Sequence, residues 1–125
     1  GAQKPAPKKQ IKFEREIQSV FYNNKYVGIS YSDTKKENSW HIKVYDMNGK
    51  TVMENDTEIA YNRIELLDNN EICVRDDYNC ELFTIHSIRK FRYTFDRQLY
   101  NVLSGSDGQN YTLVLNGEIE EVRLQ

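Results

Sequence analysis

The sequence has few of the residues that interrupt strands or cross-link a chain. Its 125 residues include only two prolines, six glycines and two cysteines. Both prolines, Pro5 and Pro7, lie in the polar, basic stretch of residues 1–10, which we expect to be a flexible linker. The scarcity of glycine and proline after residue 10, together with nine tyrosines, favours strands because aromatic residues are enriched there.

The chain also lacks an excess of charge and a long apolar run. Lys and Arg number 17 against 19 Asp and Glu, so the net charge is −2 and no positive field favours a nucleic-acid partner. No run approaches the roughly 18 apolar residues that a membrane span needs. Because the chain opens with Gly1 rather than Met, we expect it to be a segment of a longer protein.

Motifs that carry chemistry are missing as well. The two histidines, His41 and His86, have no Gly-x-Ser-x-Gly motif or similar context for nucleophilic catalysis, and they show no zinc-binding spacing with the cysteines. The calcium-loop fragment at residues 46–49 is explained equally well by a hairpin turn. The sequence therefore predicts no catalytic residue, no metal site and no cofactor, and we expect a protein that is not an enzyme.

The clearest positive signal is a β-hairpin at residues 40–55. Asn48-Gly49 is the preferred dipeptide of a type I′ turn, and β-branched or aromatic residues flank it on both sides. The predicted register pairs Val44 with Met53, Tyr45 with Val52 and Lys43 with Glu54.

Other turn signals divide the rest of the chain into short strands. A turn at Asn23-Asn24 predicts Val20 opposite Val27, and Asn116-Gly117 is a second type I′ signal that predicts Val114 opposite Ile119. A three-residue turn at 68–70 predicts the pairs Leu66 with Ile72 and Ile64 with Val74. Period-two alternation predicts further strands at residues 11–17, 79–85, 88–95, 99–103 and 110–115.

The two cysteines lie on neighbouring strands, and two loops can join those strands. A three-residue loop centred on Asp77 turns Cys73 away from Cys80, whereas a two-residue loop at Asp76-Asp77 places the sulfurs opposite each other, where a disulfide is geometrically allowed. We favour two small buried thiols, and the disulfide stays open as the alternative.

A degenerate repeat relates these hairpins. Residues 26–29, 71–74 and 111–114 each follow a tight polar turn, at spacings that are typical of β-propeller blades. We therefore predict an all-β fold of consecutive antiparallel meander units that resemble propeller blades in an incomplete ring. The single domain covers residues 11–125, with three units at about 11–57, 58–97 and 98–125. A closed up-and-down β-barrel that carries a small ligand is the alternative.

The stretches 17–32, 44–50 and 118–124 resemble a family of Gram-positive bacterial proteins without assigned activity. Proteins of that family look like single-pass membrane proteins with an extracytoplasmic β-propeller-like domain, and the chain resembles their C-terminal third. The resemblance implies a membrane-anchored parent and an extracytoplasmic location. It supplies no catalytic residue.

The remaining functional signal is aromatic. Exposed Tyr and Trp side chains stack on sugars and anchor protein partners, although packing between units explains them at least as well. We therefore expect a non-catalytic binding or scaffolding segment with a protein or glycan partner at the cell envelope. Open edges near residues 11–17 and 118–124 also predict weak self-association. The candidate binding aromatics are Tyr22, Tyr26, Tyr31, Trp40 and Tyr45.

Overall fold

The computed structural model of the chain describes residues 4–32, 39–105 and 107–124. Every regular element in these residues is a β-strand, so the all-β prediction is confirmed. Accordingly, no helix in the described ranges is long and apolar enough to cross a membrane. The strands are β1 (Ser19–Tyr22), β2 (Tyr26–Ser32), β3 (Trp40–Asp46), β4 (Thr51–Thr57), β5 (Arg63–Leu66), β6 (Ile72–Arg75), β7 (Asn79–Phe83), β8 (Arg89–Thr94), β9 (Leu99–Ser104), β10 (Asn110–Leu115) and β11 (Glu118–Arg123).

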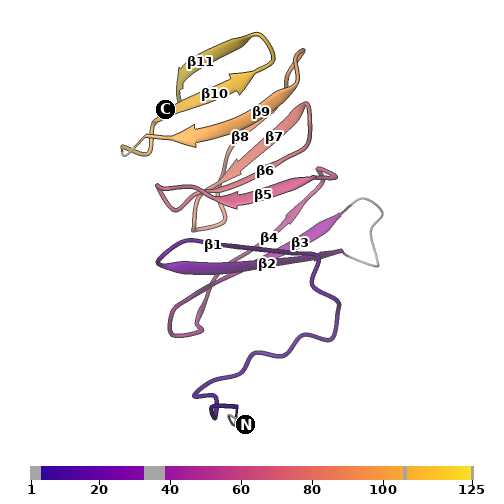
Figure 1. The fold of residues 1–125 in the computed structure, drawn as a ribbon, viewed down its shortest axis with the longest axis vertical. Coiled ribbons are helices and arrows are strands. Elements are labelled where there is room, and N and C mark those ends of the chain that lie inside the picture. The colour runs from indigo at the N-terminus through magenta and orange to yellow at the C-terminus, as the bar shows by residue number, and fades with distance from the viewer. Residues whose placement is uncertain (1–3, 33–38, 106, 125) are drawn as a thin grey trace.

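The strands form three separate antiparallel meanders, which we call sheets A, B and C. Sheet A has the order β1-β2-β3-β4, sheet B the order β5-β6-β7-β8, and sheet C consists of β9, β10 and β11 with β10 in the middle. Figure 1 shows the sheets stacked along the chain, with sheet A nearest the N-terminus and sheet C at the C-terminal end. None of the three closes into a barrel, so the propeller-blade-like arrangement is the one that forms. The ligand-carrier alternative thereby loses the enclosed interior that it required.

Sheet B lies in the middle, and its central strands β6 and β7 are buried on both faces. Ile72 and Val74 on β6 and Phe83 on β7 belong to a core shared with sheet A. Cys73, together with Cys80 and Leu82, belongs to a second core shared with sheet C. Successive residues of a strand point to opposite faces, so a strand between two cores carries apolar residues on both faces, and its buried charged residues Arg75 and Glu81 need partners. Burying one such side chain stabilises the fold by about 1.5–3 kcal/mol relative to leaving it exposed.

The sequence repeat corresponds to equivalent positions in the three sheets. Residues 26–29 lie in β2, residues 72–74 in β6 and residues 111–114 in β10, and each of these strands is the second of its meander. Each sheet contains an equivalent hairpin at this place. The pattern of turn residues followed by an apolar strand therefore recurs along the sequence.

The hairpins β3–β4, β5–β6 and β7–β8 share a three-residue loop. In each, the third loop residue donates its N–H to the carbonyl that precedes the loop, at 2.9–3.1 Å. The third residues Gly49, Asn70 and Ser87 have φ of +79°, +67° and +67°. A type I turn followed by a left-handed residue has this pattern.

The predicted type I′ turn at Asn48-Gly49 is therefore wrong, because only Gly49 has a positive φ. The Asp46 carboxylate accepts the N–H groups of Asn48 at 2.9 Å and Lys50 at 3.0 Å, which stabilises the wider loop. The register shifts after Val44, so Tyr45 pairs with Thr51 and not with Val52. The predicted pairs Val44 with Met53 and Lys43 with Glu54 are confirmed, as are Leu66 with Ile72 and Ile64 with Val74.

Two further turn predictions need correction. Val20 pairs with Ile29 rather than Val27, because the Asn23 side chain accepts the N–H groups of Lys25 and Tyr26 and moves the loop centre by one residue. In the last hairpin, Val114 does pair with Ile119, but only Gly117 has a positive φ (+88°), which is the φ pattern of a type II rather than a type I′ turn.

The cysteines take a register that neither predicted loop gives. Cys73 pairs with Leu82, and Cys80 pairs with Arg75, so both thiols lie on the same face of sheet B. The prediction that Cys73 faces away from Cys80 is thus wrong. Their sulfurs are 3.7 Å apart and unbonded, and both residues are buried, which confirms the favoured interpretation of two buried thiols. The hydrogen bond to Cys80, followed by burial, raises the pKa of the Cys73 thiol.

Residues 11–17 do not form the predicted strand, although their side chains alternate in type. The first ladder contact of this region is the bond from Gln18 N–H to the Ser30 carbonyl, at 2.8 Å. The segment instead crosses the face of sheet A that points away from sheet B, where the Phe13 ring centroid lies 6.2 Å from that of Tyr45. The edge strands of sheet A are β1 and β4, and residues 11–17 form a ladder with neither of them.

Candidate functional site

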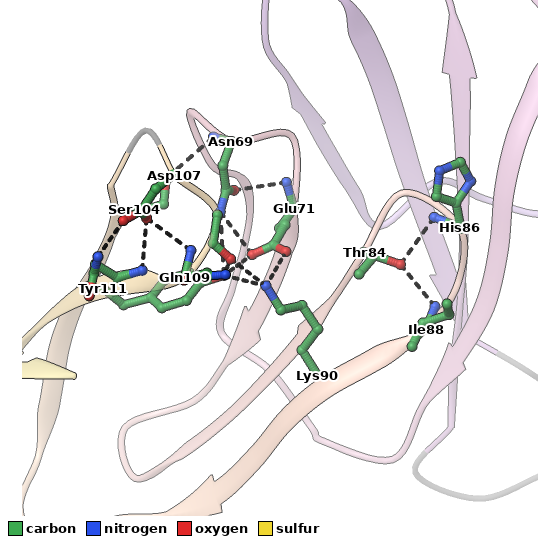
Figure 2. A network of polar contacts seen from close by, with 12 residues as sticks. Asn69, Glu71, Thr84, His86, Ile88, Lys90, Ser104, Asp107, Gln109 and Tyr111 are labelled. Carbon is green, nitrogen blue, oxygen red and sulfur yellow. Dashed lines mark hydrogen bonds and ion pairs between the residues drawn. The ribbon is translucent and has the colours of Figure 1, made fainter. Parts of the chain in front are cut away.

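A polar cluster joins sheets B and C, and Figure 2 shows it from close by. Lys90 reaches from β8, Tyr111 belongs to β10, and Glu71 directly precedes β6. The ammonium of Lys90 donates to Glu71 Oε2 at 2.7 Å, to the Gly108 carbonyl at 2.7 Å and to Tyr111 Oη at 2.9 Å. Tyr111 Oη donates to Glu71 Oε1, which also accepts Asn69 Nδ2 at 2.8 Å.

The Lys90 ammonium has no proton left for a ligand. An ammonium has three protons, and all three of Lys90 are donated within the chain. Partial burial opposes the charge of Lys90, but its hydrogen bonds to Glu71 and Tyr111 outweigh burial and raise its pKa. Burial, and then the bond to Glu71, raises the pKa of Tyr111. Lys90, Glu71 and Tyr111 therefore form a charged hydrogen-bond network that connects sheets B and C.

A second tie joins sheets A and B around Glu81 on β7. Thr57 of β4 donates Oγ1 to Glu81 Oε2 at 2.8 Å, and Arg89 donates Nη1 to Oε1 at 3.2 Å. Glu81 is only 2% exposed, so each carboxylate oxygen needs its donor. Across the described residues, no buried side-chain nitrogen or oxygen lacks a hydrogen-bond partner.

The two histidines occupy separate places. His86 lies in the β7–β8 turn, and its backbone N–H donates to Thr84 Oγ1 at 3.2 Å. His41 lies on the outward face of sheet A, where Nδ1 is 2.5 Å from Asp56 Oδ1 and Nε2 is 3.6 Å from Glu54 Oε2. We did not predict this trio, although the correctly predicted register of Lys43 with Glu54 also places His41 opposite Asp56. No group of three His, Cys, Asp or Glu residues in the described part of the chain is arranged to hold a metal ion.

The five candidate binding aromatics do not form one platform. Strand alternation places Tyr22, Tyr31 and Tyr45 on the outward face of sheet A. Tyr26 lies on the other face and packs against the core between sheets A and B. Trp40 shares that face and meets Tyr61 edge to face, with ring centroids 5.8 Å apart. Two of the five therefore serve packing between units.

A groove of about 550 Å³ lies on the outward face of sheet A, beneath the N-terminal segment. Arg15 donates Nη1 to the Ser32 carbonyl at 3.0 Å and places its guanidinium 5.7 Å from the Tyr31 ring centroid. The groove therefore combines aromatic surface with three cations and one acid. Its lining residues are Lys12, Phe13, Glu14, Arg15, Tyr31, His41 and Lys43.

Comparison with protein-family models matches residues 1–124 to a family of unknown function, DUF5711. Comparison with curated proteins gives no significant match.

Proposed function

The chain belongs to the DUF5711 family, whose function is unknown, and on that premise we propose that it is a non-catalytic binding or scaffolding segment of a larger propeller-like domain. The resemblance of residues 17–32, 44–50 and 118–124 supports a parent that is anchored by a single membrane span in a Gram-positive bacterium, with this domain outside the cytoplasm. Its partner there is a protein or glycan of the envelope.

The observation that carries the proposal is the contrast between the middle and the ends of the stack. The central strands β6 and β7 of sheet B bury both faces, whereas the outward faces of sheets A and C keep large apolar side chains in solvent. Val20 and Tyr22 are 59% and 73% exposed on sheet A, and Ile119 is 69% exposed on sheet C. Exposed apolar patches on a folded protein typically mark sites of contact with other parts of the protein or with a partner. We therefore assign the outward faces of sheets A and C to contacts with further units or partners.

Saturated internal polar groups favour binding over catalysis. Lys90 and Glu81 form hydrogen bonds that connect neighbouring sheets, and His41 contacts Asp56. A catalytic acid or base needs a free position toward substrate. What the chain offers to another molecule is therefore its outer surface.

Hydrogen exchange tests the scaffold proposal on the chain itself. We expect the amides of β6 and β7 to exchange slowest, because both faces of sheet B are covered, and those of β1, β2 and β11 to exchange much faster. The unfolded chain in denaturant supplies the intrinsic rates. Equal protection from Ser19 to Arg123 would show that the end sheets need no neighbours.

The location is tested in the producing organism. Externally added protease should digest the protein on intact cells while a cytoplasmic enzyme of the same cells survives. Protection that is lost only when the membrane is lysed would refute the extracytoplasmic assignment.

A further inference from the structure

Two cysteines lie side by side in the core between sheets B and C. Cys73 of β6 is fully buried, and Cys80 of β7 is 1% exposed. Cys73 pairs with Leu82, and Cys80 pairs with Arg75, so the two cysteines are diagonal neighbours on one face of sheet B. Long side chains at such diagonal positions come within reach of each other. The two sulfurs are accordingly 3.7 Å apart.

The surroundings isolate this pair of thiols. Within the described part of the chain, neither thiol makes a hydrogen bond except to the other. A thiol is only a weak donor and a weak acceptor, so this contact adds little to stability. What distinguishes the pair is the closeness of two oxidisable sulfurs. The core around them is apolar and includes Leu67, Leu82, Leu99, Val102 and Leu113.

The two sulfurs are placed so that a covalent bond between them needs only a local movement. A disulfide requires a distance of about 2.0 Å, so the sulfurs of Cys73 and Cys80 must approach each other from 3.7 Å by about 1.7 Å. Rotation of the two side chains about their Cα–Cβ bonds moves the sulfurs on this scale. The register of β6 with β7 therefore need not change.

The folded core shields the thiols from reagents in solution. The hydrogen bond to Cys80, and then burial, raises the pKa of the Cys73 thiol, so little of the attacking thiolate form is present. A reagent reaches either sulfur only when the chain opens or while it is still folding. The redox state that the pair acquires during folding is therefore retained in the folded chain.

We propose that Cys73 and Cys80 are the site of an intrachain disulfide, which forms when the chain folds in the presence of a small-molecule disulfide as the oxidant. The thiolate of one cysteine attacks the oxidant, forms a mixed disulfide and releases one small thiolate. The thiolate of the other cysteine then attacks the protein sulfur of that mixed disulfide, which forms the Cys73–Cys80 bond and releases the second small thiolate. The two cysteine protons pass to the two released thiolates, so two protein thiols are oxidised and one small disulfide is reduced.

The bond links the two central strands of the stack. The cysteines are seven positions apart, and closing even this short loop restricts the unfolded chain, which stabilises the folded one. A chain that folds among reducing thiols keeps both thiols, whereas one that folds in an oxidising compartment acquires the bond. The proposal concerns the core of the chain itself, so it is independent of the binding partner and of the envelope location.

Redox equilibrium of the purified chain tests the proposal. The chain is equilibrated with reduced and oxidised glutathione, both in native buffer and in urea that unfolds it, starting from the reduced and from the oxidised form. Alkylation followed by mass spectrometry then counts the free thiols. We expect the equilibrium constant for the intrachain disulfide to be at least about tenfold higher in the folded chain than in urea. A constant in the folded chain that is no higher than in urea would overturn the proposal.

The variant Cys73→Val/Val74→Cys is the matched control. It keeps both thiols and the composition of β6, but it moves one thiol to the opposite face of sheet B. Its equilibrium constant in urea should match that of the wild type, and folding should not raise it. A gain on folding equal to that of the wild type would show that the face does not matter, and would overturn the assigned geometry.

A second measurement needs no variant and therefore does not depend on whether the control folds. By linkage, a disulfide that the native geometry favours must stabilise the folded chain by the same factor. The oxidised wild-type chain should therefore unfold at a higher urea concentration than the reduced chain. An equal or lower midpoint for the oxidised chain would overturn the proposal.

Discussion

Replacing Lys90 by methionine should detach sheet C from sheet B. Methionine keeps most of the side-chain length but removes the three hydrogen bonds to Glu71, Gly108 and Tyr111. The Glu71 carboxylate then keeps its donors from Tyr111 and Asn69 but loses its counter-charge. Glu71 and Lys90 have side chains that are 10% and 20% exposed, so water replaces the lost ammonium poorly.

The magnitude follows from that burial. Removing one partner of a fully buried ion pair costs about 3–5 kcal/mol. Because Glu71 keeps two hydrogen bonds and Lys90 is partly exposed, we expect a loss of about 2–4 kcal/mol in the free energy of unfolding. A domain of ordinary stability has only about 5–15 kcal/mol in total. The variant should therefore show faster hydrogen exchange in β9, β10 and β11 before β6 is affected.

Urea denaturation measures the loss, and a double-mutant cycle assigns it. Glu71→Leu in the Lys90→Met background removes the unpaired charge, so the double variant should lose about 1–3 kcal/mol less than the sum of the two single losses. Arg63→Met, in an exposed pair with Glu65 at 3.5 Å, is the control and should cost at most about 1 kcal/mol. A loss below about 0.5 kcal/mol for Lys90→Met would refute the reasoning, since surface substitutions cost that little.

Three further outcomes are expected. Gly49→Val should lower the free energy of unfolding by about 1–3 kcal/mol in a urea titration, because φ at this position is +79°; an unchanged midpoint would show that the loop rearranges. Since the pKa values of Lys90 and Tyr111 are both raised in the folded state, each group contributes stability below its unfolded pKa that is lost as pH rises above about 10, and Lys90→Met should flatten this alkaline decline. A thiol reagent should label Cys73 and Cys80 only as fast as the chain opens, so labelling within seconds in native buffer would contradict their burial.

Turn residues and period-two alternation were sufficient to predict most strands and several registers. The pairs Leu66 with Ile72 and Val114 with Ile119 follow from loop length and apolar matching alone. The loop at Asn48-Gly49 was mispredicted because the Asp46 carboxylate competes for the backbone N–H groups. The residues Asp, Asn and Gly occur both in a two-residue type I′ turn and in the three-residue loop that forms here. Composition alone therefore does not distinguish the two loops.

The ties between sheets were not predictable in the same way. Glu71 and Tyr111 are 40 residues apart and meet only because sheets B and C stack. Periodicity assigns each side chain to a face, but it does not say which residue of the next sheet lies across from it. The spacing of the repeat was visible in the sequence, but Lys90 has no periodic signature because it is the extra residue of a β-bulge, between Arg89 and Phe91.

Residues 11–17 bring these two limits together. Their alternation is as regular as that of β10, yet within one copy they form no ladder, since pattern sets the faces of a strand and an available edge decides whether it forms. Alternation of side-chain type therefore identifies a segment that is able to pair, and the arrangement of the sheets decides whether it does.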